Sequence, residues 1–570
     1  MLPTAAPDTI AASDGTEVDA PGAIAPGPPA PVAARAPERT GRFAAFIAIG
    51  ILSSRILGLV RTAVFSHYLG AGPAADAFNA ALKIPNYLQN LFGEGVLSAS
   101  FIPVYARLLG AGERDEADRV AAAVGAILAL TVALLVAVGM LATPLLVTLV
   151  ATGFRGDTRE LAVRLVRITF PGIGLLVMSA WCLGILNSHR RFLLSYLAPV
   201  GMNVVLIATL VHWGGRGLAD DRLATTLAWG VVVGSAVQLF VQVPTVLRVA
   251  PGLWRRTALS PSLRTRVRDD VRTVVRNFGP VFVGRGVVQL SAFIDSTLAS
   301  LIAPGALTVF ANAQQLYLLP GSLFGMSISA AELPAMSSLQ GRADEVAALL
   351  RERLSAGLRR IAFFVIPSAV AFVSLGDVIA GAAFHYGRFT RGDVVWVWGT
   401  LAGSAVGLLA STLGRLYSST FYALKETRTP LRLALVRVAL TLALGYVAAV
   451  PLPRALGISP RWGTAGLTAT AGVAGWVEFL LLRRALNRRI GPTGIPGRAV
   501  TRLWGAALAS GAVGIGAKFA AGRLPAVALA GLVCGAYGVS YLAITAALGE
   551  GESAAVVRRL RRRLGGPARA

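Results

Sequence analysis

The chain has 570 residues, of which 55% are hydrophobic and 14% are charged, and its mean hydropathy is +0.65. Soluble domains carry roughly 25% charged residues, so this composition excludes a large soluble domain and predicts an all-α polytopic membrane protein. The net charge of +26 would suggest nucleic acid as a partner of a soluble protein, but here the basic residues gather in short loops, as in cytoplasmic loops beside anionic lipid.

The residues before the first apolar run read as a tail. Residues 1–42 are rich in proline and alanine and contain no hydrophobic core segment, which predicts a disordered cytoplasmic tail rather than a signal peptide.

Fourteen segments after this tail are long and apolar enough to cross a bilayer, for which a helix needs about 20 residues. Their expected limits are 43–70, 76–106, 120–151, 160–187, 192–213, 223–247, 274–302, 306–338, 356–381, 393–423, 430–451, 463–486, 501–521 and 524–548.

Arginine-rich loops set the expected topology. Residues 248–276 hold eight arginines, residues 342–360 hold five and residues 483–502 hold six. Because such loops stay in the cytoplasm, both termini are expected there, and the number of spans is even.

The simplest partition is two six-helix lobes around a central cavity, followed by a terminal helix pair. Its expected limits are 43–247 for the first lobe, 248–273 for a basic cytoplasmic loop, 274–486 for the second lobe, 487–500 for a second loop, 501–548 for the terminal pair and 549–570 for a basic tail.

Charged residues inside the first two apolar segments suggest the chemistry of that cavity. Arg55 and Arg61 lie about 120° apart on an ideal helix, so both can line one broad cavity. Two guanidinium groups could together hold a diphosphate, because each pairs with phosphate through two parallel hydrogen bonds. The alternative is that both side chains reach an interface.

The second segment adds further polar candidates, namely Asp76, Lys83, Asn86 and Glu94. The alternatives are a loop position for Asp76 and structural pairing for Lys83 and Glu94.

The seventh and eighth segments hold the remaining candidates. Arg285 and Gln289 share a helix face, and Asp295 lies within about 80° of Arg285. The eighth segment carries Gln315, and Glu332 lies nearer its cytoplasmic end. Asp295 and Glu332 are candidates for coupling to Na⁺ or H⁺, while the alternative is that these groups satisfy neighbouring helices.

No catalytic or metal-ligating pattern accompanies these residues. The two cysteines lie in apolar segments, and the four histidines are scattered, so neither a disulfide framework nor a metal site is expected. We therefore expect a transporter rather than an enzyme, with no cofactor.

Several sequence pieces together resemble one family, the MurJ (MviN) lipid II flippases of the multidrug/oligosaccharidyl-lipid/polysaccharide exporter superfamily. They are SRILGLVR (54–61), GAGPAADAFNAALKIPN (70–86), LFGEGVLSASFIPVY (91–105), LPGSLFG (319–325), FHYGRFT (384–390) and FYALKETRTP (421–430). The resemblance covers roughly residues 44–550 in order.

The resemblance implies fourteen helices, a cationic cavity between two lobes, and a terminal pair that holds a polyprenyl tail. It implies a monomer of the bacterial cytoplasmic (inner) membrane whose partner is lipid II, the polyprenyl-diphosphate-linked peptidoglycan precursor. The activity would be alternating access driven by the membrane potential.

Gln89, Gln315 and Leu318 stand where the family carries charged residues, and we hypothesise that Arg285 replaces the cation absent at Gln315. The alternatives are a flippase for another polyprenyl-diphosphate-linked glycan, a cation-coupled drug exporter of the same superfamily, or a non-transporting membrane scaffold.

Overall fold

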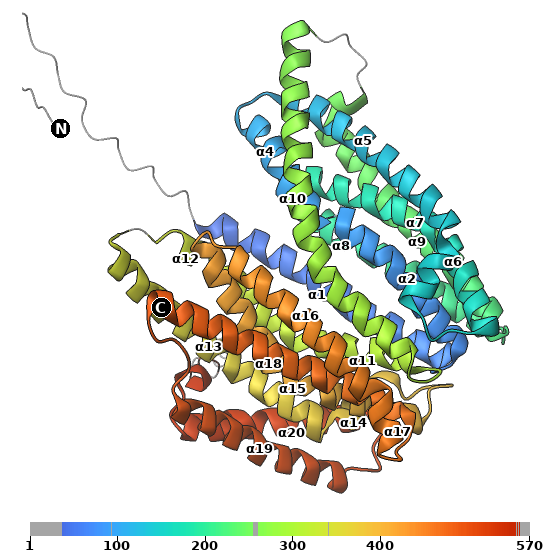
Figure 1. Cartoon of the computed structure of the whole chain (residues 1–570), viewed down its shortest axis with the longest axis vertical. Helices are drawn as coiled ribbons and strands as arrows, with labels where there is room; N and C mark the ends of the chain where they lie inside the picture. The colour runs from blue at the N-terminus through green and yellow to red at the C-terminus, as the bar shows by residue number, and fades with distance from the viewer. Residues whose placement is uncertain are drawn as a thin grey trace, which may run out of the picture. The chain divides into compact units, whose positions relative to one another are not determined.

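The computed structural model describes residues 37–92, 94–254, 260–339, 341–554, 556 and 558. These residues form helices and no strand, which confirms the predicted all-α class. The described residues from Phe46 onward belong to one compact unit (Figure 1), and residues 37–45 belong to another.

The described part of the first half contains nine α-helices and two short segments of other helical type. They are α1 (Pro37–Leu69), α2 (Pro73–Phe92), α3 (Glu94–Ser100), α4 (Ile102–Gly110), α5 (Arg114–Leu141), α6 (Thr143–Val150), α7 (Gly156–Ser188), α8 (Phe192–Thr209), the π-helical η1 (Leu210–Gly214), α9 (Asp220–Val249) and the 3₁₀ segment η2 (Pro251–Trp254).

The second half begins with the longest helix among the described residues. Its elements are α10 (Pro261–Ser300), α11 (Ala306–Pro320), the π-helical η3 (Gly321–Met326), α12 (Ser327–Ser337), α13 (Ala343–Ser374), α14 (Gly376–Phe384), α15 (Arg391–Ala423), α16 (Arg428–Ala449), α17 (Pro451–Ala455), the 3₁₀ segment η4 (Pro460–Trp462), α18 (Gly463–Ile490), α19 (Gly497–Ala520) and α20 (Ala526–Ala547).

Each of the fourteen predicted spans coincides with helix, although several consist of two or three consecutive elements. Among the described residues, eleven helices are long and apolar enough to cross a membrane. The other three predicted spans, in α1, in α2–α4 and in α10, carry all the charged candidates of the sequence analysis except Glu332.

The element limits differ from the predicted ones at the basic loops. Ser260 caps α10 by accepting a hydrogen bond from the Leu263 amide at 3.3 Å, and Pro261 takes the first helical position. This cap starts the helix well before its apolar run, so much of the expected loop 248–273 is helix. The loop expected over 487–500 narrows to residues 491–496, and α1 begins at Pro37, inside the expected tail 1–42. Most of the basic tail 549–570 lies outside the described residues.

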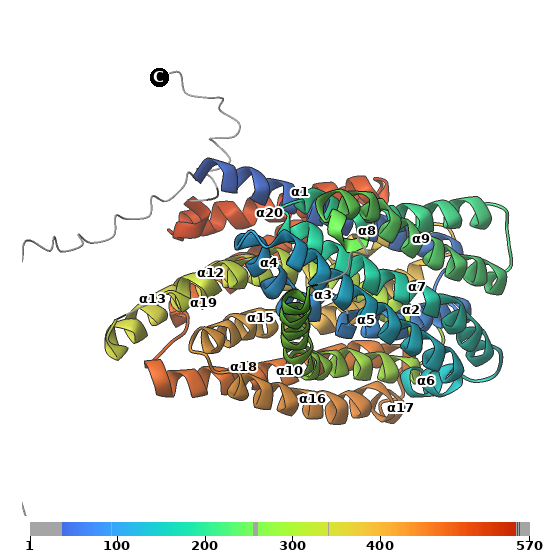
Figure 2. The same cartoon turned by 90° about the horizontal axis from the view of Figure 1, so that it is seen from above.

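Helix α10 connects two groups of helices. It packs against α2, α3 and α5 from the first half and against α11, α16 and α18 from the second. Figures 1 and 2 show it beside both groups. One long helix therefore contacts both groups.

Small residues allow α15 and α18 to approach closely. A Cβ atom on Gly407 would lie 2.5 Å from the Gly472 Cα, and one on Gly403 would lie 2.4 Å from the Ala465 carbonyl oxygen. Membrane helices associate through such small-residue spacing because it lets their backbones pack directly.

The terminal helix pair is fixed to α13 at a proline. Pro367 lies inside α13 and has no N–H to donate to the carbonyl of Phe363. The Tyr541 hydroxyl of α20 donates to that carbonyl at 2.8 Å, and the Tyr537 hydroxyl donates to the Pro367 carbonyl at 2.7 Å. The two tyrosines thus satisfy backbone oxygens at the interruption of α13.

A polar network joins α4, α5 and the residue that follows α7. The Tyr105 hydroxyl lies 3.0 Å from the His189 Nε2, and the Asp118 carboxylate accepts from the Gly252 amide at 2.8 Å. Burial is the main cause that lowers the pKa of His189, and the positive charges of Arg114 and Arg191 lower it further. The neutral imidazole is therefore the favoured form.

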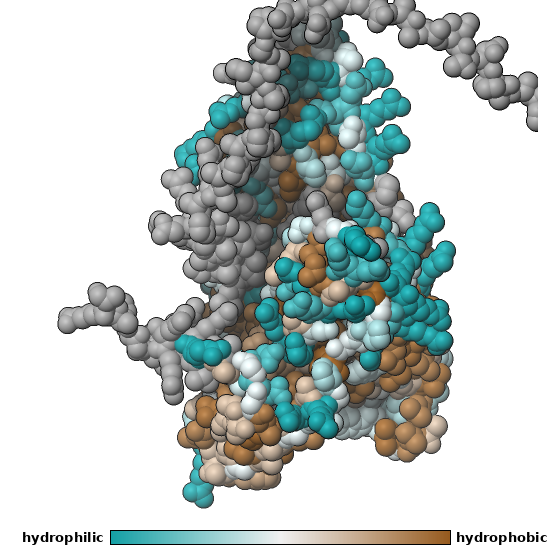
Figure 3. Space-filling view, turned by 90° about the vertical axis from the view of Figure 1, so that its left-hand side faces the viewer, coloured by the Kyte–Doolittle hydropathy of each residue, from teal (hydrophilic) through white to brown (hydrophobic). Residues whose placement is uncertain are grey.

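Large apolar side chains cover much of the helix surfaces. Leu130, Leu141, Phe519 and Val539 are each at least 70% exposed. On the face in Figure 3, hydrophobic residues are most frequent in the lower part of the view, and hydrophilic residues are most frequent above them. A protein surface of this kind suits a lipid environment better than water.

Candidate functional site

A polar pocket lies between helices of the two halves. It encloses about 110 Å³ and is lined by seven apolar residues and five polar side chains. The polar side chains are Arg61 and Thr62 of α1, Asn79 of α2, and Asn312 and Gln315 of α11. The Thr62 hydroxyl already donates to the Gly58 carbonyl at 2.9 Å, which leaves Arg61 and the three amides.

Arg61 is the cation of this pocket. Its side chain is half-buried, and no carboxylate of the described residues lies within ion-pair distance of it. A partly buried charge without a counter-ion is costly, so an anionic group that enters the pocket would be stabilised there.

Two amides of the pocket are held by neighbouring side chains. The Asn312 Nδ2 donates to the Ser66 hydroxyl at 3.0 Å, and the Asn79 Nδ2 donates to the Thr308 hydroxyl at 3.1 Å. These bonds use the amide N–H groups and orient both side chains, which are contributed by opposite halves of the chain. The pocket is thus built by contacts between the halves.

Asp76 lies at the start of α2, and its carboxylate is hydrogen-bonded to the start of α11. Its carboxylate is 2% exposed and accepts hydrogen bonds from the Gly305 amide at 2.6 Å, the Thr308 amide at 2.8 Å and the Thr308 hydroxyl at 2.7 Å. Gly305 has a left-handed backbone, with φ of 90°. The predicted cavity residue therefore caps a helix of the other half, since carboxylates favour helix N-termini.

Lys83 lies about two turns after Asp76 in the same helix. Its ammonium donates to the Ser296 hydroxyl at 2.5 Å and lies 5.0 Å from the centre of the Phe310 ring. Both partners belong to the second half, in α10 and α11. Lys83 therefore contacts the other half but does not line the pocket of Arg61.

Asp295 faces a second pocket, inside the second half. This pocket encloses about 130 Å³ and also holds Arg437 of α16. The Arg437 guanidinium donates to the Glu478 carboxylate at 3.2 Å, while its Nε and the Asp295 Oδ1 are buried and have no hydrogen-bond partner among the described residues. A carboxylate and a guanidinium thus face the same small polar space without touching.

The other predicted residues whose side chains are described lie outside both pockets. Arg55 and Asn86 are exposed. Glu332 lies 3.6 Å from Arg353 and 3.7 Å from Arg360 in ion pairs. The side chains of Glu94, Arg285 and Gln289 lie outside the described residues, so the hypothesis that Arg285 replaces a cation absent at Gln315 stays a prediction.

Asn79 and Arg437 are site residues that the sequence analysis did not single out. Asn79 could have been found, because it shares a helix face with Asp76, Lys83 and Asn86 at spacings of three, four and three residues. Arg437 carried a weaker signal, a single charge in the middle of the apolar run of α16.

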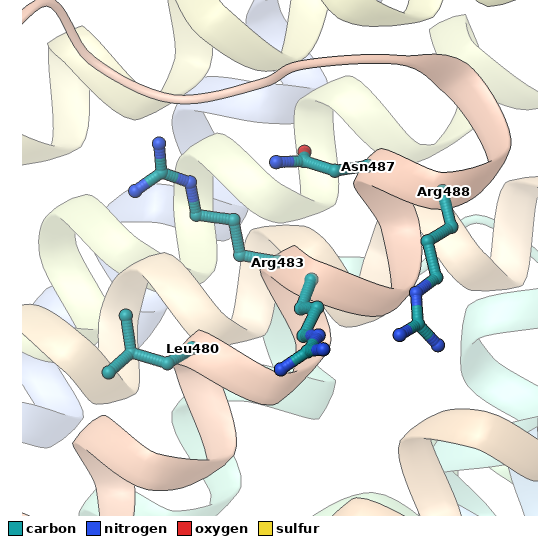
Figure 4. Close-up of a pocket in the computed structure, with 5 residues that line it drawn as sticks. Leu480, Arg483, Asn487 and Arg488 are labelled. Carbon is teal, nitrogen blue, oxygen red and sulfur yellow. The ribbon is translucent and has the colours of Figure 1, made fainter.

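A third hollow, of about 370 Å³, lies at the end of α18 and is lined by residues of that helix alone. Figure 4 shows Leu480, Arg483, Asn487 and Arg488 projecting from it. Arg483 Nε donates to the Thr493 carbonyl at 3.0 Å, and Asn487 Oδ1 accepts from the Thr493 amide at 3.0 Å. These contacts fix the turn before α19, which assigns part of the hollow a structural role.

Comparison with known proteins gives consistent matches. The family model described as "Lipid II flippase MurJ" matches residues 65–540. The lipid II flippase MurJ of Burkholderia cenocepacia is 32% identical over 442 residues, which are 77% of this chain and 82% of that protein.

Two solved structures share the fold. One, titled "Lipid II flippase MurJ, inward closed conformation", has a TM-score of 0.71 at 22% identity and covers 88% of this chain and 98% of its own. The other, an inward-facing multidrug resistance MATE family transporter of the MOP superfamily, has a TM-score of 0.58 at 20% identity and covers 77% and 98%.

Proposed function

The chain belongs to the lipid II flippase MurJ family, and on that premise we propose that it moves lipid II from the inner to the outer leaflet of the bacterial cytoplasmic membrane. The transported molecule carries its charge on a diphosphate and keeps its polyprenyl tail in the lipid. The protein acts as a transporter and makes or breaks no covalent bond.

The observation that carries this proposal is the half-buried guanidinium of Arg61, which pairs with no carboxylate of the described residues, in a pocket shared by the two halves. A pocket at such an interface changes shape when the halves move, as alternating access requires. Its amides offer hydrogen bonds to sugar or peptide groups next to the diphosphate.

Replacement of Arg61 in cells that depend on this protein tests the proposal. The native flippase is depleted, this chain is expressed, and lipid II exposed on the outer leaflet is measured with a hydrolase that acts from outside. We expect Arg61→Ala to lower the rate at least ten-fold, since one charge-assisted hydrogen-bonded pair contributes about 1.5–3 kcal/mol. Arg61→Lys keeps the charge but loses the bidentate geometry, and an intermediate rate is expected.

Arg454→Ala is the matched control, because this exposed arginine lies on α17, away from the pocket. Wild-type rates in Arg61→Ala would refute the role of the pocket. Failure of the wild-type chain to restore outer-leaflet lipid II would refute the substrate.

A flippase for another polyprenyl-diphosphate-linked glycan is the second candidate. It is favoured by the neutral amides Asn79, Asn312 and Gln315, which make Arg61 the sole cation among the described lining residues. Loss of a different surface glycan on deletion, with normal peptidoglycan synthesis, would select it. A drug exporter is disfavoured by the same arginine, because it repels cationic solutes.

The membrane potential is the driving force that the charges support. An inside-negative potential favours outward movement of an anion by about 2.3 kcal/mol per charge per 100 mV. Coupling to Na⁺ or H⁺ would involve Asp295, but Arg437 in the same pocket opposes entry of a second cation. We therefore expect flipping in proteoliposomes to follow an imposed potential and to persist when Na⁺ is replaced by choline; strict Na⁺ dependence would contradict this.

The positions of the arginine-rich segments support a multi-pass orientation with both termini in the cytoplasm. Thiol labelling in intact cells, of cysteines placed in loops on either side of the membrane, would test this orientation. The protein would act as a monomer with lipid II as its partner.

A further inference from the structure

The loop before α15 carries the FHYGRFT sequence, which the proposed pocket does not use. Its residue Arg388 forms a bidentate ion pair with Asp220 at the first turn of α9, in which Nη1 donates to Oδ1 and Nη2 donates to Oδ2, the latter at 3.0 Å. The Arg388 amide also donates to the His67 carbonyl near the end of α1, at 2.9 Å. One residue of the second half thus holds two helix ends of the first half.

The backbones on both sides are shaped for this contact. Gly387 has φ of 57°, and a Cβ atom there would lie 2.5 Å from the His67 carbonyl oxygen. Gly70 has φ of 62°, and its Cβ would lie 3.1 Å from the Arg388 carbonyl oxygen. Left-handed backbone is unfavourable for other residues, so the glycines permit an approach that side chains would prevent.

We call each contact between the two halves a seam, and the contact of Arg388 is the first. A second seam joins the same ends of the helices. The start of α2 and the start of α11 are joined there by Asp76 with Gly305 and Thr308. That seam is buried, whereas the side chains of Arg388 and Asp220 are 57% and 38% exposed. An exposed ion pair contributes little free energy, so the outer of the two seams can break at little cost.

We propose that Arg388 and Asp220 form a latch that keeps the external ends of the two halves together in this conformation and separates when the head group is released outward. The proposal rests on the proposed function and deepens it, because it assigns to two residues far from the pocket a role in the transport cycle. Its premise is that the ends of α1 and the starts of α9 and α15 face outward, as the arginine-rich loops at the opposite ends predict.

Accessibility of the pocket from outside measures the latch independently of any transport assay. Thr62→Cys lines the pocket, and exposed Cys534 is replaced by serine in the same chain. The reporter is labelled in intact cells with a membrane-impermeant maleimide. We expect Arg388→Ala and Asp220→Ala each to speed labelling about three- to five-fold, as loss of one exposed ion pair allows.

The double variant Asp220→Ala with Arg388→Ala should label no faster than either single variant, because both remove the same interaction. The charge swap Asp220→Arg with Arg388→Asp should return labelling toward the slow rate and shows that the loop still folds. Unchanged labelling in the single variants, or additive effects in the double variant, would overturn the latch.

Cross-linking tests whether the latch must open. In the Cys534→Ser background, Asp220→Cys and Arg388→Cys are joined by a short bifunctional methanethiosulfonate, and flipping should stop until a reductant is added. The matched control joins Asp377→Cys with Lys518→Cys, whose native side chains also pair, at 2.5 Å, but within the second half.

The control cross-link should leave flipping unchanged. Continued flipping across the Asp220–Arg388 link would refute the latch and leave the proposed function intact. Absence of lipid II transport by the wild-type chain would refute the proposed function, while the labelling results would still decide the latch.

Discussion

The carboxylate of Asp76 offers the strongest test of how the halves are joined. In Asp76→Ala, two buried amides and one hydroxyl lose their acceptor. The Thr308 hydroxyl keeps the hydrogen bond that it accepts from the Asn79 Nδ2, but the amides of Gly305 and Thr308 are left unsatisfied. Each orphaned buried donor costs about 1–3 kcal/mol, so the expected loss is about 4 kcal/mol.

Asp76→Asn should cost about half as much. Its amide oxygen can accept from one backbone N–H, but its NH₂ group then faces the second donor and cannot accept from it. Thr308→Val should cost less in the Asp76→Ala chain than in the wild-type chain, because the hydrogen bond to Asp76 is already lost and only the one accepted from Asn79 remains.

Thermal unfolding of the purified protein in detergent, followed by loss of monodisperse protein, measures these changes. A chain of this size does not unfold in one step, so the apparent midpoint is compared between variants, and a fall of about 5 °C is expected for Asp76→Ala. Asp157→Asn, at an exposed position in the first turn of α7, is the control and should change the midpoint by under about 1 °C. An unchanged midpoint in Asp76→Ala, or additive effects with Thr308→Val, would show that the cap does not hold the seam.

Two further predictions concern packing and pH. Gly407→Ala should lower the apparent midpoint by an amount that reflects about 1–3 kcal/mol of overpacking, because its Cβ would meet the Gly472 backbone. Gly535→Ala has open space around it and should leave the midpoint unchanged. Equal midpoints in the two variants would contradict direct backbone contact. His189 has a lowered pKa, so its contribution to stability is complete above the unfolded value of about 6.5 and is lost as pH falls through the lower folded value. Acidification from about pH 7 to 5 should therefore lower the midpoint more in the wild-type chain than in His189→Gln, and identical pH profiles would show that His189 is not responsible.

The helices could be predicted from sequence because each apolar run is long enough to span a bilayer. The limits of α10 could not, since its charged first turns are stabilised by the Ser260 cap and by packing on α5 rather than by apolar periodicity. Segments of consecutive helices, such as α11, η3 and α12, also read as one run because a π-helical segment leaves no clear sequence signal.

The candidate site was predictable only in part. Arg61 stood out as a charge within an apolar helix, and it does line a pocket between the halves. The partner of Asp76 lies 229 residues away in sequence at Gly305, and nothing local to Asp76 separates a helix cap from a cavity ligand. For the same reason, the contact of Arg388 with Asp220 follows from the tertiary fold alone.

The two tyrosines of α20 also bear on how the protein can be shortened. A chain that stopped before α19 would leave the Phe363 carbonyl, freed by Pro367, facing hydrocarbon with no donor in reach. The last two helices are therefore built into the stability of α13 itself. Attempts to trim the protein for crystallisation or for a minimal transporter should replace Pro367 before they remove the C-terminal pair.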